Sequence, residues 1–256
     1  PQEIFFYRFL IAYLGIWVIS PKRLFTNNWQ DELWLVAGGI FGGSLYFFTE
    51  NTALGITQAS NVSFIICTAP LLTTILSLLF YKSEKASKGL IYGSLLALMG
   101  VGLIVFNGSF VLKISPIGDL LTLLAALSWA FYSLIIKKMA GRYPTIFITR
   151  KIFFYGVLTI LPAFLLHPLH PDTAVLLQPA VLFNLLFLAV LASLICYVLW
   201  NVVLKQLGTV RASNYIYLNP LVTMIASFLI LDEKITLVAL GGAACIVCGV
   251  YWAEKK

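Results

Sequence analysis

Charged residues are scarce in this sequence of 256 residues, of which only 11% are charged and 61% are hydrophobic. A soluble domain has roughly half hydrophobic and about a quarter charged residues. The scarcity of charge therefore excludes both an ordinary soluble domain and an intrinsically disordered chain. The 4 cysteines are too few for a disulfide-stabilised scaffold. The composition predicts an integral membrane protein.

Motifs for catalysis and for nucleotide binding are also absent. The sequence has no HExxH, no GxSxG, no paired-Asp motif and no GxxxxGK[ST] phosphate loop. His167 and His170 lie in a proline-marked turn segment, HPLHPD, that could bind a metal only weakly. Cys245 and Cys248 form a CxxC inside an apolar stretch without a second pair. We therefore expect no enzymatic activity, no cofactor and no metal, and nothing supports coupling to ATP.

Nine apolar segments are each long enough to span a bilayer as a helix, which takes about 20 residues. A β-barrel would need strands of alternating polarity, whereas runs such as LIYGSLLALMGVGLIVF are apolar on every face. The predicted spans are 2–20, 32–54, 58–82, 88–106, 115–138, 144–166, 180–205, 212–231 and 236–253.

Basic residues are concentrated at every second connection between these spans. They are Lys22, Arg23, Lys82, Lys85, Lys88, Lys137, Lys138, Arg142, Lys205, Arg211, Lys255 and Lys256, while the alternate connections hold Lys113 and Lys234. By the positive-inside rule, the C-terminus is cytoplasmic and, with nine spans, residue 1 faces outside. Because no soluble face gathers basic residues, the net charge of +7 does not indicate a nucleic-acid partner.

The chain contains an internal repeat. LGITQASN at 54–61 returns as LGTVRASN at 207–214, and downstream Pro70 corresponds to Pro220. Further on, residues 149 apart correspond, as in Gly93 and Gly242. The same order of matches at the same places in predicted helices indicates a duplication. We predict a first repeat at 1–106 and a second at 107–256.

The second repeat holds five predicted helices and the first holds four, because the helix 115–138 has no counterpart. A duplicated unit with an odd number of helices reverses its direction through the membrane. The predicted fold is therefore all-α, with nine helices in two inverted repeats of a five-helix unit, and we expect a tenth helix upstream of Pro1.

Together these segments resemble the EamA-type transporters of the drug/metabolite transporter superfamily. The resemblance covers GDLLTLLAALSWAFYSLIIKK at 118–138, the paired LG…ASN segments, and the Glu-Lys-x-Ser/Thr caps followed by spaced glycines. It implies a ten-helix carrier of the bacterial inner membrane that exports amino acids or other small metabolites by alternating access. The missing first helix, which in the family lines the central cavity, is a departure from this pattern.

Three charged residues at membrane depth need a partner or a water-filled cavity. Arg8 and its repeat mate Arg150 could hold a substrate carboxylate or lock a gate, or they could reach the headgroups or pair with carbonyls. Glu50 could couple transport to protons or bind an ammonium group, although pairing with Arg8 explains it equally well.

Aromatic and amide side chains are the candidates for lining a substrate cavity, with packing and interfacial belts as the alternative. The candidate set is Tyr46, Glu50, Asn61, Trp129, Tyr132, Tyr197, Asn201, Asn214 and Tyr217. Pro70 and Pro220 interrupt apolar helices and could act as hinges or as static kinks. We expect the cavity at mid-membrane, between the repeats.

A secondary transporter of a small molecule within a lipid bilayer is the leading interpretation, with protons as a potential coupling ion. A membrane-embedded enzyme would need clustered catalytic groups at membrane depth, and a channel-like facilitator would differ in whether its flux saturates. The sequence does not indicate the substrate or the oligomeric state.

The distribution of basic residues makes a topology prediction. In a cysteine-free background, cysteines placed near Lys85 and Lys138 should resist an impermeant thiol reagent added outside sealed cells, and cysteines near Lys113 and Asp172 should react. Labelling of all four sites would contradict the number of spans, and the reverse pattern would contradict the orientation.

Overall fold

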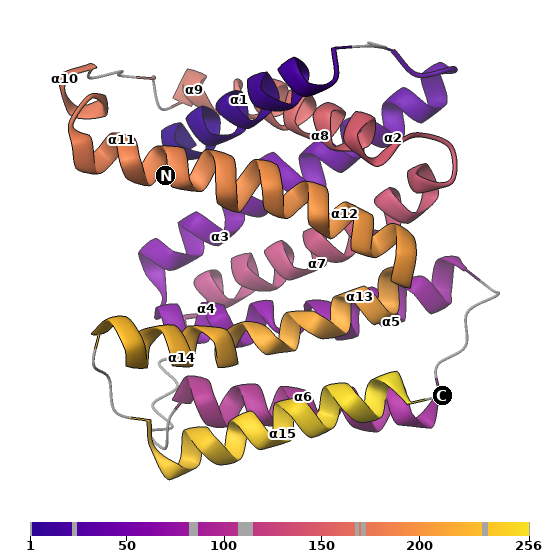
Figure 1. Ribbon diagram of the computed structural model, residues 1–256, viewed down its shortest axis with the longest axis vertical. Coiled ribbons are helices and arrows are strands. Elements are labelled where there is room, and N and C mark those ends of the chain that lie inside the picture. Colours follow the sequence, from indigo (N-terminus) through magenta and orange to yellow (C-terminus); the bar gives the residue numbers. More distant parts are fainter. Residues whose placement is uncertain are drawn as a thin grey trace. The chain divides into compact units, whose positions relative to one another are not determined.

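The computed structural model describes residues 2–21, 25–81, 87–106, 115–166, 169, 173–231 and 235–255. Every secondary-structure element in these residues is a helix (Figure 1). The predicted all-helical class is thus confirmed. The connections carrying Lys22, Arg23, Lys82, Lys85, Lys113 and Lys234, the Glu-Lys pairs at 84–85 and 233–234, and the His167–His170 pair lie outside the described residues.

Eight helices in the described residues are long and apolar enough to cross a membrane. They are Gln2–Ile19, Ala59–Phe80, Lys88–Phe106, Pro116–Ala140, Thr145–Leu165, Pro179–Leu207, Thr209–Ile230 and Leu237–Glu254. The predicted span 32–54 is helical from Trp29 to Ile56 but is not among the eight. The count of nine spans therefore stays a prediction.

The chain divides into two compact units, and the first comprises residues 1–48 and 131–206. Its elements are α1 (Gln2–Ile19), α2 (Trp29–Gly39), η1 (Ile40–Ser44), the start of α3 (Leu45–Ile56), the second half of α7 (Pro116–Ala140), α8 (Thr145–Ile160), α9 (Ala163–Leu166), α10 (Thr173–Leu176), α11 (Pro179–Leu186), η2 (Phe187–Ile195) and α12 (Cys196–Leu207). Helix α8 packs against α1, α2 and η1, and α1 also packs against η2.

Two π-helical segments, η1 and η2, interrupt α-helices of the first unit. They fall in the predicted spans 32–54 and 180–205, each of which directly precedes one of the LG…ASN segments. Short π-helical segments inside α-helices are rare and are frequently found at functional sites. The pair therefore marks corresponding places in the two sequence repeats.

The second unit comprises residues 49–130 and 207–256. Its elements are the rest of α3, α4 (Ala59–Ile66), α5 (Ala69–Phe80), α6 (Lys88–Phe106), the first half of α7, α13 (Thr209–Asn214), η3 (Tyr215–Leu218), α14 (Asn219–Leu231) and α15 (Leu237–Glu254). Helix α6 lies against α15, and α13 packs against α5 (Figure 1).

Both repeated prolines lie in the first turn of a helix. Helix α4 ends at Ile66 and α5 begins at Ala69, so that Pro70 is the second residue of the new helix. In the second copy, the 3₁₀ segment η3 separates α13 from α14, where Pro220 is again the second residue. Proline lacks an N–H donor and is tolerated at this position, where the donor would have no partner within the helix.

Glycines bring α6 and α15 into backbone contact. A Cβ added to Gly100 would lie 2.5 Å from the Gly242 carbonyl oxygen, and one added to Gly249 would lie 2.5 Å from that of Gly93. Since Gly93 faces Gly249 while Gly100 faces Gly242, the two helices run antiparallel. Small residues that permit such close approach are typical of helix packing in membranes.

This packing predicts opposite effects for two adjacent substitutions in α15. Gly242→Ala should lower stability by about 1–3 kcal/mol, because its Cβ would meet the Gly100 carbonyl and the Leu103 Cβ. Gly241→Ala should be neutral or stabilising, because its Cβ would meet no atom within 4 Å among the described residues beyond its own stretch of helix, and alanine favours the helix. Thermal unfolding of the purified variants in detergent measures the difference, and equal melting temperatures would contradict the contact.

Candidate functional site

A buried hydrogen-bond chain in the first unit contains two of the candidate residues. The Tyr132 hydroxyl donates to Asn201 Oδ1 at 2.7 Å, and Asn201 Nδ2 donates to Thr149 Oγ1 at 2.9 Å. Thr149 in turn donates to the Thr145 carbonyl at 2.9 Å. The chain joins α7, α12 and α8, and the Tyr132, Asn201 and Thr149 side chains are fully buried. Both ends of the Asn201 amide are therefore engaged in holding the three helices together.

Tyr197 lies one helical turn before Asn201 and belongs to a cluster of aromatic side chains in the same unit. Its hydroxyl donates to the Gly42 carbonyl in η1 at 2.7 Å. Its ring lies 5.7 Å from Phe9 and 5.4 Å from Phe153. Gly42 is required here, because a Cβ would overlap the Tyr132 ring.

The two candidate arginines, Arg8 and Arg150, both lie in the first unit and both bind uncharged oxygen atoms. Arg8 Nε donates to the Ser193 hydroxyl in η2 at 2.8 Å, and its guanidinium lies 4.6 Å from the centre of the Phe47 ring. Arg150 is buried and donates to the Ser20 carbonyl. A carbonyl or hydroxyl oxygen satisfies a buried guanidinium as well as a bound solute would. These contacts therefore agree with a structural role for the two arginines and also with a role in binding a solute or closing a gate.

An acidic pair at the start of α2 was not singled out from the sequence. Asp31 is buried and accepts from Arg142 Nη1 at 2.6 Å and from the Tyr143 hydroxyl at 2.8 Å. The neighbouring Glu32 accepts from Lys151 and Tyr155 of α8.

Two features of the sequence could have drawn attention to this network. Asn28 caps α2, as its side chain accepts from the Asp31 N–H at 2.8 Å, and acidic residues are favoured in the turn that follows such a cap. Lys151 lies within an apolar span next to Arg150, and a lysine there needs a partner as much as an arginine does.

The second unit contains buried polar groups without partners. Asn214 at the end of α13 is 0% exposed, and neither atom of its amide has a hydrogen-bond partner among the described residues. The Ser213, Thr209 and Thr73 hydroxyls are also buried and lack partners in that part of the chain. Since α13 packs against α5, which carries Thr73, these groups belong to neighbouring helices whose buried hydroxyls and amide find no partner within the described part of the chain.

The other candidates of the second unit lie on several of its helices. Asn61 in α4 and Tyr217 in η3 are buried, whereas Glu50 in α3 and Trp129 in α7 are half-buried. Tyr46 belongs to the first unit, where its ring meets that of Phe47 at 5.0 Å. The predicted cavity walled by Glu50, Asn61, Trp129, Tyr197 and Asn214 draws on both units and stays a prediction.

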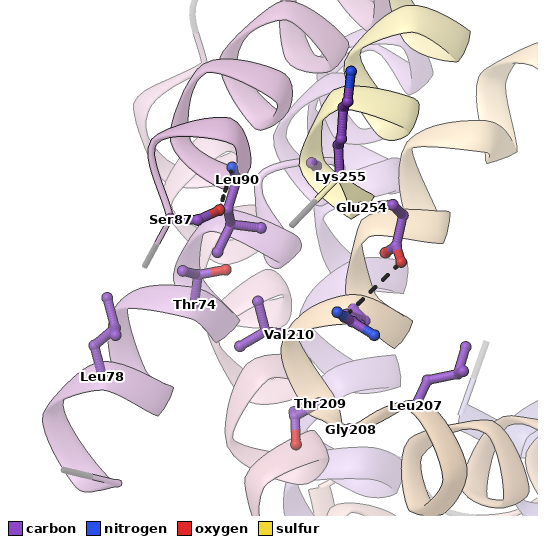
Figure 2. Close-up of a pocket in the computed structure, with 12 residues that line it drawn as sticks. Thr74, Leu78, Ser87, Leu90, Leu207, Gly208, Thr209, Val210, Glu254 and Lys255 are labelled. Carbon is purple, nitrogen blue, oxygen red and sulfur yellow. Dashed lines mark hydrogen bonds and ion pairs between the residues drawn. The ribbon is translucent and has the colours of Figure 1, made fainter. Parts of the chain in front are cut away.

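A pocket of the second unit is lined by two residues of the predicted basic connections, Arg211 and Lys255. It has a volume of about 290 Å³ and is lined by the start of α6, the segment from Leu207 to Arg211 and the end of α15 (Figure 2). Arg211 Nε lies 4.0 Å from Glu254 Oε2. The dashed line from Glu254 in Figure 2 marks this ion pair. Ser87 caps α6 in the same pocket by accepting from the Leu90 N–H at 3.0 Å.

Removing the charge of Glu32 should be costly, because Lys151 is 6% exposed and would lose its anionic partner. We expect Glu32→Gln to lower stability by about 3 kcal/mol, the lower end of the range for a buried pair, since Glu32 is partly exposed. Adding Lys151→Met should restore much of the loss. Thermal unfolding of the two single variants and the double variant measures the coupling, and additive losses would show that the pair is not coupled.

Comparisons with known proteins agree with the helical architecture. The EamA-like transporter family matches residues 1–106 and 116–253. An uncharacterized transporter of Archaeoglobus fulgidus is 30% identical over 260 residues, covering 100% of this chain and 88% of the relative. A probable amino-acid metabolite efflux pump of Escherichia coli is 24% identical over 248 residues, covering 94% of this chain and 81% of the pump.

One solved crystal structure has the same fold, with a TM-score of 0.81 at 18% identity, over 99% of this chain and 87% of the other. The names of the relatives point to transporters rather than to enzymes. The family match extends over nearly the whole chain and through both sequence repeats. The chain belongs to the EamA-like transporter family.

Proposed function

We propose that this protein is a secondary transporter that exports an amino acid or a similar small metabolite across the inner membrane by alternating access. Membership of a transporter family supports transport in general. The efflux pump of Escherichia coli supports the choice of amino-acid metabolites and of export. Zwitterionic solutes of this kind need both hydrogen-bond donors and acceptors in a site screened from water.

The packing of α6 against α15 supports an inverted repeat. Gly93 corresponds to Gly242, and Gly100 corresponds to Gly249, at the same separation of 149 residues. The contacts join Gly93 to Gly249 and Gly100 to Gly242, so exchanging each glycine for its repeat mate reproduces the same two contacts. A pair of antiparallel helices with this property is related by a local two-fold axis, as expected for inverted repeats.

The packing of α6 against α15 also supports the prediction that two of the basic connections lie on the same side of the membrane. A Cβ on Gly89, near the start of α6, would lie 2.9 Å from the Trp252 carbonyl oxygen and 3.3 Å from that of Lys255, near the end of α15. Lys88, at the start of α6, and Lys255, just after the end of α15, thus belong to one end of the pair. By the positive-inside rule this end is the cytoplasmic one.

The unpartnered amide of Asn214 is the observation that carries the proposed site. A buried amide without partners costs free energy that a bound solute would recover. Its N–H₂ group can donate to a solute carboxylate and its oxygen can accept from an ammonium group. We propose that two other buried residues of the second unit share this role, namely Tyr217 and Asn61, the repeat mate of Asn214.

We propose more limited roles for the other candidate residues. Tyr132, Tyr197 and Asn201 form the rigid wall of the first unit, with Tyr46 and Trp129 as further lining residues. Arg8 and Arg150 act at gates or on a solute carboxylate, and Glu50 couples transport to protons or binds the solute ammonium. Pro70 and Pro220 serve as hinges, because each lies where the chain passes from one helical segment to the next.

Counterflow in proteoliposomes tests the proposal. Vesicles containing the purified protein are loaded with a mixture of unlabelled amino acids and diluted into a trace of the radiolabelled mixture. A carrier should give transient accumulation of label that saturates with concentration. A channel-like facilitator would give flux that neither saturates nor responds to internal amino acid, and no flux of any amino acid would contradict the substrate class. Retention of amino acid by cells that overproduce the protein would contradict export.

Two asparagine variants separate solute binding from structural support. Asn214→Leu should abolish or strongly reduce counterflow while leaving the melting temperature unchanged or higher, because no hydrogen bond is lost. Asn201→Leu should instead destabilise the protein by about 1–3 kcal/mol, because Tyr132 loses its acceptor. If the two variants lost equal stability, and folded Asn214→Leu protein still gave normal counterflow, Asn214 would have a structural role.

A further inference from the structure

A large apolar groove runs along one face of α6 beside the end of α15. It has a volume of about 880 Å³, and its walls are Tyr92, Leu95, Leu96 and Met99 of α6 with Trp252 of α15. The four α6 residues follow the i, i+3, i+4, i+7 spacing of a single helical face. Tyr92, Leu95 and Met99 are each more than half exposed, so the groove is open along its length.

One end of this groove is basic. Lys88 and Lys255 line it together with Ser87, the residue that caps the first turn of α6. Figure 2 shows the Lys255 side chain extending away from Glu254. The positive end of the α6 dipole adds to the charge of the two lysines. This end is therefore complementary to a phosphate group.

The length of the groove matches one leaflet of a bilayer. Lys88 and Met99 are eleven positions apart, which corresponds to about 16 Å along a helix. Half of the hydrocarbon core of a bilayer is about 15 Å thick. Tyr92 and Trp252, near the basic end, are the residue types that favour the boundary between headgroups and acyl chains. An acyl chain entering at the lysines would thus end close to Met99.

We propose that this groove is a specific binding site for an anionic phospholipid. The phosphate lies between Lys88 and Lys255 at the start of α6, and one acyl chain follows Tyr92, Leu95 and Met99. The site is built on the helix pair that the glycines lock together, so a bound lipid follows α6 and contacts the end of α15. Loss of transport activity for another reason would leave this binding unchanged.

Native mass spectrometry of the full chain in detergent tests the charge complementarity. Phosphatidylglycerol should remain bound at activation energies that strip phosphatidylcholine. The double variant Lys88→Gln with Lys255→Gln should weaken phosphatidylglycerol binding at least tenfold, since each basic residue near a lipid surface contributes about fivefold. Lys205→Gln, which removes a basic residue outside the groove, should have no effect, and glycerol phosphate should not compete.

A pair of groove variants tests the acyl-chain contact. Leu95→Trp should lower phosphatidylglycerol binding by filling the groove, whereas Ile91→Trp, at an exposed position of α6 outside it, should not. Both positions are exposed, so neither change should prevent folding. If phosphatidylglycerol and phosphatidylcholine were retained equally, the protein would bind nonspecific annular lipid only. The same conclusion would follow if neither the lysine variant nor the groove variant changed the binding of phosphatidylglycerol. A dimer that lipid does not displace and that Leu95→Trp disrupts would show that a second copy of the chain occupies the groove.

Discussion

The structure depends on the fact that a bilayer offers no hydrogen-bond partner to a buried polar group. In the first unit the chain meets this constraint internally. Tyr132, Asn201 and Thr149 bond in sequence, and Lys151 lies against Glu32 with Tyr155 at its side. These contacts link helices far apart in the sequence, so the polar groups that are costly in lipid become the connections that hold the unit together.

The second unit is held together differently. Its α6 and α15 meet through glycine backbones. Among the described residues, the Thr73 hydroxyl of α5 and the Asn214 amide of α13 have no hydrogen-bond partner. In the proposed function, the buried amide of Asn214 binds the solute. The symmetry of the glycine contacts also explains why both repeats kept glycine at these two places, because each glycine faces the mate of the other.

Much of the fold could be predicted from the sequence, because long apolar runs and the repeated LG…ASN segments are local signals. The pairing of Glu32 with Lys151 and of Tyr132 with Asn201 could not, since it depends on which helices pack together. The π-helical segments η1 and η2 have no local signal comparable to a proline. Asn201 and Asn214 looked alike in the sequence, and only their surroundings distinguish an amide that is bonded from one that is not. The nine-span count and the cavity between the repeats stay predictions.

The central claim is that solute binding changes which side of the membrane the site faces. Double electron–electron resonance would measure two distances in a cysteine-free background, one between labels at Gly141→Cys and Leu79→Cys and one between labels at Leu165→Cys and Ile117→Cys. Each pair joins the two units at exposed positions, at opposite ends of the predicted topology. Alternating access predicts that saturating amino acid lengthens one distance and shortens the other. Changes of the same sign, or no change with amino acid bound, would contradict it.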